Sequence, residues 1–166
     1  MTGAGGHGPS QTHGPSTTRT ESGVAKRPQY KEVEHTADVG VELEAPDLRS
    51  AFEAAAACMF DMMCDLDKVG ETLHRELRVK GREGDIENLM VRWLNEVLYL
   101  FESERILLSS FDVRRLSGDE LEATVGGEKY DRRRHAIKIE IKAPTYHDIR
   151  VERSHPGFRV RVIFDT

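Results

Sequence analysis

The stretch D-I-E-N-L-M-V-R-W-L-N-E-V-L-Y-L-F, residues 85–101, decides the fold class of this chain. Its apolar residues recur at intervals of three and four, which predicts an amphipathic helix with one broad buried side. Asp85 is the predicted N-cap, because an aspartate side chain accepts hydrogen bonds from the first N–H groups of a helix. The residues on the apolar side are Ile86, Leu89, Met90, Trp93, Leu94, Val97, Leu98 and Phe101. Such a helix needs a second layer of structure to cover that side.

A second helix is predicted upstream, beginning after Asp47, which follows Pro46 and is the expected N-cap. Before it, residues 30–34 have the character of a short strand, and residues 39–44 alternate between apolar and polar side chains. The tetrapeptide H-T-A-D, residues 35–38, is then a bend or bulge between two strands. The apolar positions of the upstream helix are Ala51, Phe52, Ala55, Met59 and Met62.

Most of the remaining sequence predicts strands. Residues 73–79 form one, and from residue 106 onward strand follows strand, at 111–113, 121–125, 137–141, 149–151 and 158–164. The turns between them are short and carry Gly or Pro, which favours antiparallel neighbours. We therefore expect one α+β domain, with two long helices packed on a mainly antiparallel β-sheet.

Composition divides the chain at its N-terminal end. Residues 1–27 are rich in Gly, Ser, Thr, Pro and His, which is typical of a disordered tail, so the domain is expected to span 28–166. Without the three basic residues and one acidic residue of that tail, the domain carries a net charge of −7. This balance argues against broad nucleic-acid binding by the domain itself.

The expected location is the cytoplasm. No apolar run reaches the roughly 18 residues of a membrane span, so no membrane association is predicted. Cys58 and Cys64 lie in one predicted helix but on different sides of it, so they are not expected to pair. Two unpaired, buried thiols indicate a reducing compartment.

Three carboxylates of this sequence could together form a metal site. If the fold brings Asp38 close to the C-terminal F-D-T, then Asp38, Asp165 and the terminal carboxylate of Thr166 form a cluster of hard oxygen atoms. Such charges repel one another unless a cation lies between them. Oxygen ligands suit calcium or magnesium, so the sequence predicts a divalent metal site on the condition that these segments meet.

Basic and imidazole side chains form the second set of candidates. Lys142 could offset the carboxylate charge if it lies near Asp38 and Asp165. The run Arg132–Arg134 is either a solvated turn or a contact for RNA phosphate or an acidic partner. His35, His147 and His155 have no spacing that indicates a zinc site.

Four segments taken together resemble the archease family. They are Y-K-E-V-E-H-T-A-D-V-G at 30–40, W-L-N-E-V-L-Y at 93–99, the run from G-E-x-Y-D to K-A-x-T-Y-H at 127–147, and V-x-V-I-F-D at 160–165. They occur in the order and spacing of that family and cover about residues 28–166. Two positions differ from its usual pattern, Thr166 where Ile is common and Pro144 where a β-branched residue is common.

The resemblance implies a protein without catalytic activity of its own. It implies a protein cofactor that activates a GTP-dependent RNA ligase in tRNA splicing and RNA repair. Such a cofactor promotes guanylation of the ligase and its repeated turnover. It also implies a divalent ion, calcium first and magnesium or manganese as alternatives, held by Asp38, Asp165 and Thr166. His35, Lys142 and His147 become candidates for the functional surface, and tRNA becomes an indirect partner.

Two other functions remain open at this stage. A metal-dependent phosphoester hydrolase could use Asp38, Asp165 and His147 around an activated water, although the sequence shows no nucleophile motif. A chaperone-like modulator of a tRNA-modifying enzyme would need no metal. The first predicts phosphoester hydrolysis by the purified protein, and the second predicts protection of unrelated proteins from aggregation.

Overall fold

The computed structural model describes residues 27–35 and 38–166. The predicted tail, apart from Arg27, and the Thr36–Ala37 part of H-T-A-D lie outside the described residues. The division into a tail at 1–27 and a domain at 28–166 therefore stays a prediction. In chain order the elements are β1 Lys31–His35, β2 Asp38–Ala45, α1 Leu48–Met63, the 3₁₀ turn Leu66–Lys68, β3 Leu73–Lys80, α2 Ile86–Glu104, β4 Ile106–Leu116, β5 Glu120–Lys129, β6 Ala143–Pro144, β7 Arg150–Ser154 and β8 Gly157–Asp165.

Both helices begin where their caps predict. The Asp47 side chain accepts a hydrogen bond from the Ser50 N–H at 2.8 Å, and the Asp85 side chain accepts one from the Asn88 N–H at 2.9 Å. These bonds satisfy N–H groups that have no partner inside the helix. Helix α2 ends at Arg105, which has the left-handed backbone conformation (φ 55°) common at helix C-termini.

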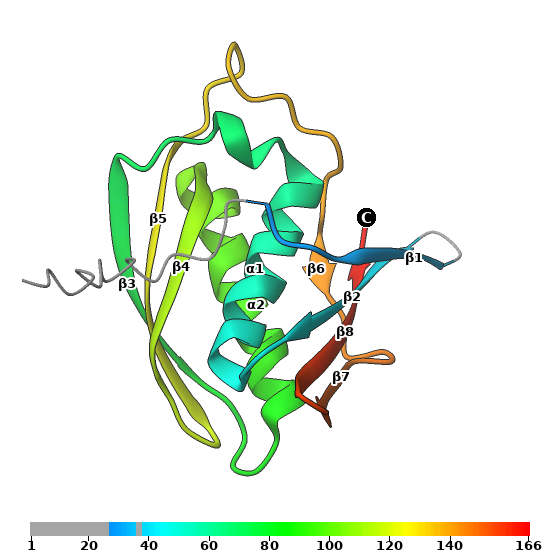
Figure 1. Ribbon diagram of the computed structural model, residues 1–166. Helices are drawn as coiled ribbons and strands as arrows, with labels where there is room; N and C mark the ends of the chain where they lie inside the picture. Colours follow the sequence, from blue (N-terminus) through cyan, green and yellow to red (C-terminus); the bar gives the residue numbers. More distant parts are fainter. Residues whose placement is uncertain (1–26, 36–37) are drawn as a thin grey trace, which may run out of the picture.

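The strands form two antiparallel sheets, with the helices between them (Figure 1). One sheet has the order β1-β2-β8-β6, with β7 also paired to β8, and the other has the order β3-β5-β4. Helix α1 contacts β2 and β8 of the first sheet and β4 of the second. The predicted α+β class is confirmed, whereas the prediction of a single sheet is wrong.

The composition of α1 explains the second sheet. Its buried residues lie on nearly all sides of the helix rather than along one stripe: Ala51, Phe52, Ala55, Ala56, Ala57, Cys58, Met59, Phe60, Met62 and Met63. A helix that is apolar nearly all round must be covered on more than one side. Cys58 and Cys64 are both buried and unpaired, as predicted.

The strand predicted over 137–141 is also wrong. Residues 136–142 run as an extended segment. Among the described residues, 136–141 pair with no strand, and bonding to β8 begins only with the Lys142 N–H and the short β6. The alternation of apolar and polar residues nevertheless predicts correctly which side chains are buried. Ile137, Ile139 and Ile141 pack on the core, whereas Lys138 and Glu140 are exposed. The Lys138 N–H donates instead to the Met63 carbonyl at the end of α1, at 2.8 Å. Period-two alternation therefore predicted an extended chain but could not supply a neighbouring strand.

Within the described part of the chain, no helix is long and apolar enough to cross a membrane.

Candidate functional site

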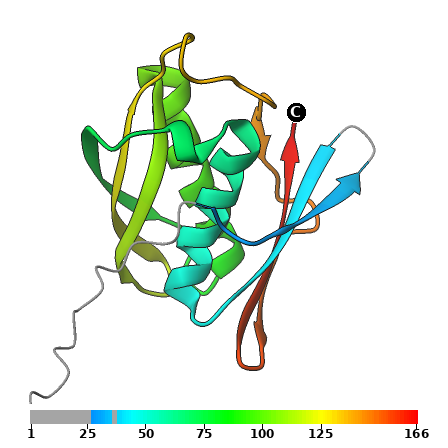
Figure 2. The same cartoon turned by 45° about the horizontal axis from the view of Figure 1, so that its top comes forward.

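The sequence predicts that the segment around Asp38 meets the C-terminal F-D-T. The fold places these two segments side by side. In the β2–β8 ladder, Asp38 is directly opposite Asp165. Figure 2 shows β2 running alongside β8 near the C-terminus. On both strands the flanking alternate residues, such as Val41 and Phe164, are buried against the helices, so Asp38 and Asp165 lie on the outward face. Directly opposite residues of an antiparallel pair have Cβ atoms about 5 Å apart. Two carboxylates are therefore neighbours on an accessible surface.

The end of β8 is anchored by its own apolar residues. Val162 and Phe164 are fully buried and Ile163 is 1% exposed. Chain ends normally fray unless they are tied into a sheet or core. The sequence V-I-F-D-T therefore fixes the main chain of Asp165 right up to the last residues, which gives the carboxylate a defined position.

Lys142 lies beside this pair. Its main-chain N–H donates to the Asp165 carbonyl at 2.8 Å, and its Nζ donates to the Thr166 main-chain oxygen at 3.1 Å. Ala143, the next residue, is opposite Asp165 in the β6–β8 ladder. The structure thus places Lys142, Asp38, Asp165 and Thr166 together, and the ammonium of Lys142 partly offsets the negative charge there.

The two histidines of the predicted surface are placed differently. His35 ends β1 opposite Asp38, so its backbone continues the same row, and its side chain lies outside what the structure describes. His147 follows β6, where the Thr145 N–H donates to the Ile163 carbonyl at 2.9 Å and Asp148 pairs with Arg161 at 2.9 Å. The backbone therefore places His147 alongside the middle of β8 and not in the row of Asp38 and Asp165.

The donors at this end are of the chemical type that a hard divalent cation prefers. Carboxylate and main-chain oxygens are the ligands that calcium and magnesium prefer, and Asp38, Asp165 and Thr166 supply both kinds. Among residues 27–35 and 38–166, no three or more His, Cys, Asp or Glu side chains are grouped to hold a metal. A cation here would therefore need the main chain of Thr166 as a ligand besides the two aspartates.

A second carboxylate site was missed by the sequence reasoning. Glu128 is 7% exposed and accepts hydrogen bonds from the Gly70 N–H at 2.6 Å, from His135 Nε2 at 3.0 Å, and from Arg134. Burial opposes its ionisation, but these donors outweigh burial and lower the pKa of Glu128 to about 2. The signal was present in G-E-x-Y-D-x-x-x-H, yet that pattern gives no spacing rule from which burial could be read.

His135 completes this network. It is 2% exposed, and its Nδ1 accepts a hydrogen bond from the Asp131 N–H at 2.9 Å. Its proton therefore lies on Nε2, which faces Glu128. The network closes the turn at 131–135 and sets the start of the extended segment that leads to Lys142.

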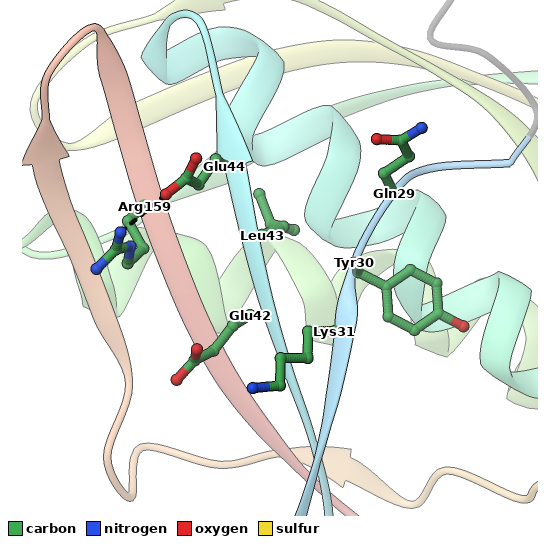
Figure 3. Close-up of a pocket in the computed structure, with 7 residues that line it drawn as sticks. All are labelled: Gln29, Tyr30, Lys31, Glu42, Leu43, Glu44 and Arg159. Atoms are coloured by element: carbon green, nitrogen blue, oxygen red, sulfur yellow. Dashed lines mark hydrogen bonds and ion pairs between the residues drawn. The ribbon is translucent and has the colours of Figure 1, made fainter.

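A pocket of about 530 Å³ opens at the other end of β2 (Figure 3). It contains none of the predicted site residues, and both of its carboxylates are already paired, Glu44 with Arg159 at 2.8 Å and Glu42 with Arg161 at 2.7 Å. It is lined by Gln29, Tyr30, Lys31, Glu42, Leu43, Glu44 and Arg159. We assign no role to this pocket.

Comparison with known proteins adds the family. A family model described as the archease protein family matches residues 30–166. The chain belongs to the archease family. Protein archease from Methanosarcina mazei is 34% identical over 141 residues, covering 82% of this chain and 95% of the relative. Protein archease from Sulfurisphaera tokodaii is 37% identical over 128 residues, covering 75% of this chain and 88% of the relative.

A solved structure supports the same assignment. The solution structure of protein 1598 from Methanobacterium thermoautotrophicum superposes with a TM-score of 0.72 at 31% sequence identity. The match covers 82% of this chain and 98% of that chain. The archease resemblance inferred from four short segments is thereby confirmed, and the α+β fold with it.

Proposed function

We propose that this protein is a non-enzymatic activator of a GTP-dependent RNA ligase, acting in tRNA splicing and RNA repair through a divalent cation held by Asp38, Asp165 and Thr166. Membership in the archease family supports the ligase as partner. The observation that carries the site is the register of β2 and β8, which sets Asp38 opposite Asp165 on an open face.

Each residue has a defined part in this proposal. Asp38 and Asp165 bind the cation from neighbouring strands, and the buried Phe164 holds Asp165 in place. Lys142 orients the Thr166 main-chain oxygen through its 3.1 Å contact. A bound divalent cation neutralises triphosphate charge, which is what guanylation of the ligase requires. The acidic end of the sheet would then approach the nucleotide site of the ligase.

The test is multiple-turnover ligation with limiting ligase, GTP and metal, in the presence of this protein or its Asp38→Ala variant. We expect wild type to accelerate turnover and Asp38→Ala to lower that acceleration at least tenfold. Glu44→Ala is the matched control, because Glu44 lies on the same strand and outward face at the opposite end. Full activation by Asp38→Ala would overturn the proposed site, and no acceleration by wild type would overturn the ligase as partner.

The hydrolase hypothesis finds less support in the geometry. It needs His147 beside the two aspartates to activate water, whereas the backbone places His147 along the middle of β8. Calcium-dependent phosphoester hydrolysis by the purified protein that disappears in Asp165→Ala would reinstate it.

A further inference from the structure

The turn at Arg132–Arg133 is a charged surface that the proposed function does not use. Both side chains are exposed, and neither forms an ion pair in the portion of the chain that the structure describes. Most other arginines of the domain are paired with carboxylates, including Arg75, Arg78 and Arg161. Arg132 and Arg133 therefore place two adjacent guanidinium groups, unpaired among the described residues, on the surface of an acidic domain with a net charge of −7.

The turn is held rigidly, so these charges are presented in a fixed place. The Arg133 N–H donates to the Asp131 side chain at 2.8 Å, and the His135 N–H donates to the Asp131 carbonyl at 2.8 Å. Arg134, the third arginine, instead pairs with the buried Glu128 and ties the turn to the core. Binding groups that are already ordered lose less conformational entropy when a ligand arrives.

Two further basic residues, Arg105 and Lys129, lie near the turn, whose own carboxylate is Asp131. The Tyr130 N–H donates to the Arg105 carbonyl at 2.7 Å, which brings Arg105 to the base of the turn. Lys129 donates from Nζ to the Glu104 main-chain carbonyl at 2.6 Å, so its charge is not neutralised by that contact. Glu104 itself pairs with Arg75 at 2.8 Å. The surface around Arg132–Arg133 is therefore locally basic.

The turn is connected directly to the acidic end of the sheet. The segment 136–142 leads from the turn to β6 (Figure 1). The last residue of this segment, Lys142, donates to the Thr166 main-chain oxygen. Lys142 is nine positions after Arg133, so the two residues are at most about 30 Å apart. A partner that receives the acidic end can therefore bring its own ligand within reach of the turn.

We propose that Arg132 and Arg133 contact the phosphate backbone of the RNA that the ligase holds. This inference rests on the proposed function. A ligase that binds RNA presents a positive surface around its active site, which attracts a domain with a net charge of −7 but repels this turn. The RNA backbone is then the anionic group available to bind the turn. A guanidinium group can donate two parallel hydrogen bonds to phosphate oxygens. The net negative charge of the domain confines this contact to the assembled complex, where the effective concentration of RNA is high.

The test measures RNA affinity and ligase guanylation separately. A fluorescein-labelled single-stranded RNA with a 3′-phosphate is titrated, without GTP, with the ligase bound to wild type or to the double variant Arg132→Ala/Arg133→Ala. Guanylation is measured with GTP and no RNA. Arg49→Ala/Arg92→Ala is the matched control, because it removes the same charge from exposed arginines on the helices. Arg134 is left intact because it supports the fold.

We expect the turn variant to weaken RNA binding by about fivefold to tenfold, while the control variant does not. The slope of log affinity against log salt should fall by about 1.4, or about 0.7 for each phosphate that the variant no longer neutralises. Guanylation without RNA should stay at the wild-type level. The variant Arg132→Lys/Arg133→Lys keeps the charge and should retain the salt slope with part of the affinity.

Three results would overturn the inference. RNA binding that is unchanged by the turn variant, or equally weakened by the control, shows that the turn does not contact RNA. Loss of guanylation in the absence of RNA shows that the turn contacts an acidic surface of the ligase instead. Failure of wild type to raise guanylation overturns the proposed function itself, which distinguishes that failure from failure of the turn alone.

Discussion

Two carboxylate regions of this protein differ in burial and in their hydrogen-bond donors. Glu128 is buried and surrounded by donors from Gly70, Arg134 and His135. Asp38 and Asp165 face each other across two strands on the outward side of a sheet. The first arrangement stabilises one negative charge, and the second places two like charges together.

The difference separates a structural role from a functional one. A buried carboxylate with its donors in place stabilises the segment it joins, and removing it leaves those donors without an acceptor. Like charges at opposite positions are slightly destabilising on their own. The Lys142 ammonium offsets part of this repulsion, and we propose that a bound divalent cation offsets more of it. The predictions below test this contrast, in order of expected size.

Replacing Glu128 by Ala should lower the free energy of unfolding by about 3 to 4 kcal/mol, because His135 and Arg134 lose the charge that they surround. Urea unfolding followed by circular dichroism measures this change. Glu44→Ala, an exposed carboxylate, should change stability by less than about 0.5 kcal/mol. A loss below about 1 kcal/mol for Glu128→Ala would show that the network does not support the fold.

Acid should weaken the same network. The ordinary carboxyl pKa is 4.5 and that of folded Glu128 is about 2, so the unfolded chain takes up this proton first as the pH falls. Stability from Glu128 is complete above pH 4.5, declines below it, and is lost near pH 2. It amounts to about 2 kcal/mol once partial solvent access is allowed for. The stability difference between wild type and Glu128→Gln should narrow by about 1 kcal/mol between about pH 5 and pH 3, and a constant difference would refute the assignment.

Removing one charge of the outward pair should affect cation binding more than stability. Asp165→Asn should weaken calcium affinity at least tenfold, or about 1.4 kcal/mol, because it removes one of the two aspartate ligands. Isothermal titration with calcium, magnesium and manganese measures the affinity and ranks the metals. Glu44→Gln serves as the control, and equal affinities of Asp165→Asn and wild type would remove Asp165 from the site.

The smallest expected effect is on the stability of Asp38→Asn, which should change sign when calcium is added. With divalent cations chelated, Asp38→Asn should raise the free energy of unfolding by up to about 0.5 kcal/mol, because the repulsion from Asp165 falls. With saturating calcium the order should reverse, since a ligand that binds the native state stabilises it in proportion to its affinity. Wild type that remains the more stable protein under both conditions would contradict the contrast drawn above.

Some parts of the candidate site could be read from the sequence and others could not. Asp38, Asp165, Thr166 and Lys142 were named from the motifs, and the fold places them together. The sequence could not show that Glu128 and His135 are buried, because their burial depends on Gly70, far away in the chain. The proposal for Arg132 and Arg133 also needed the structure, because only the structure shows that Arg134 pairs with Glu128 while its two neighbours do not.

The sequence by itself determined the local structure. Apolar spacing, cap residues and alternation predicted both helices, their first residues and most strands, because those features depend on neighbours within a few positions. Only the tertiary structure decided that the strands form two sheets around the helices, that 137–141 pairs with no strand, and that Asp38 lies opposite Asp165. Strand pairing joins residues separated by most of the chain, and the burial of distant side chains against one core fixes that register.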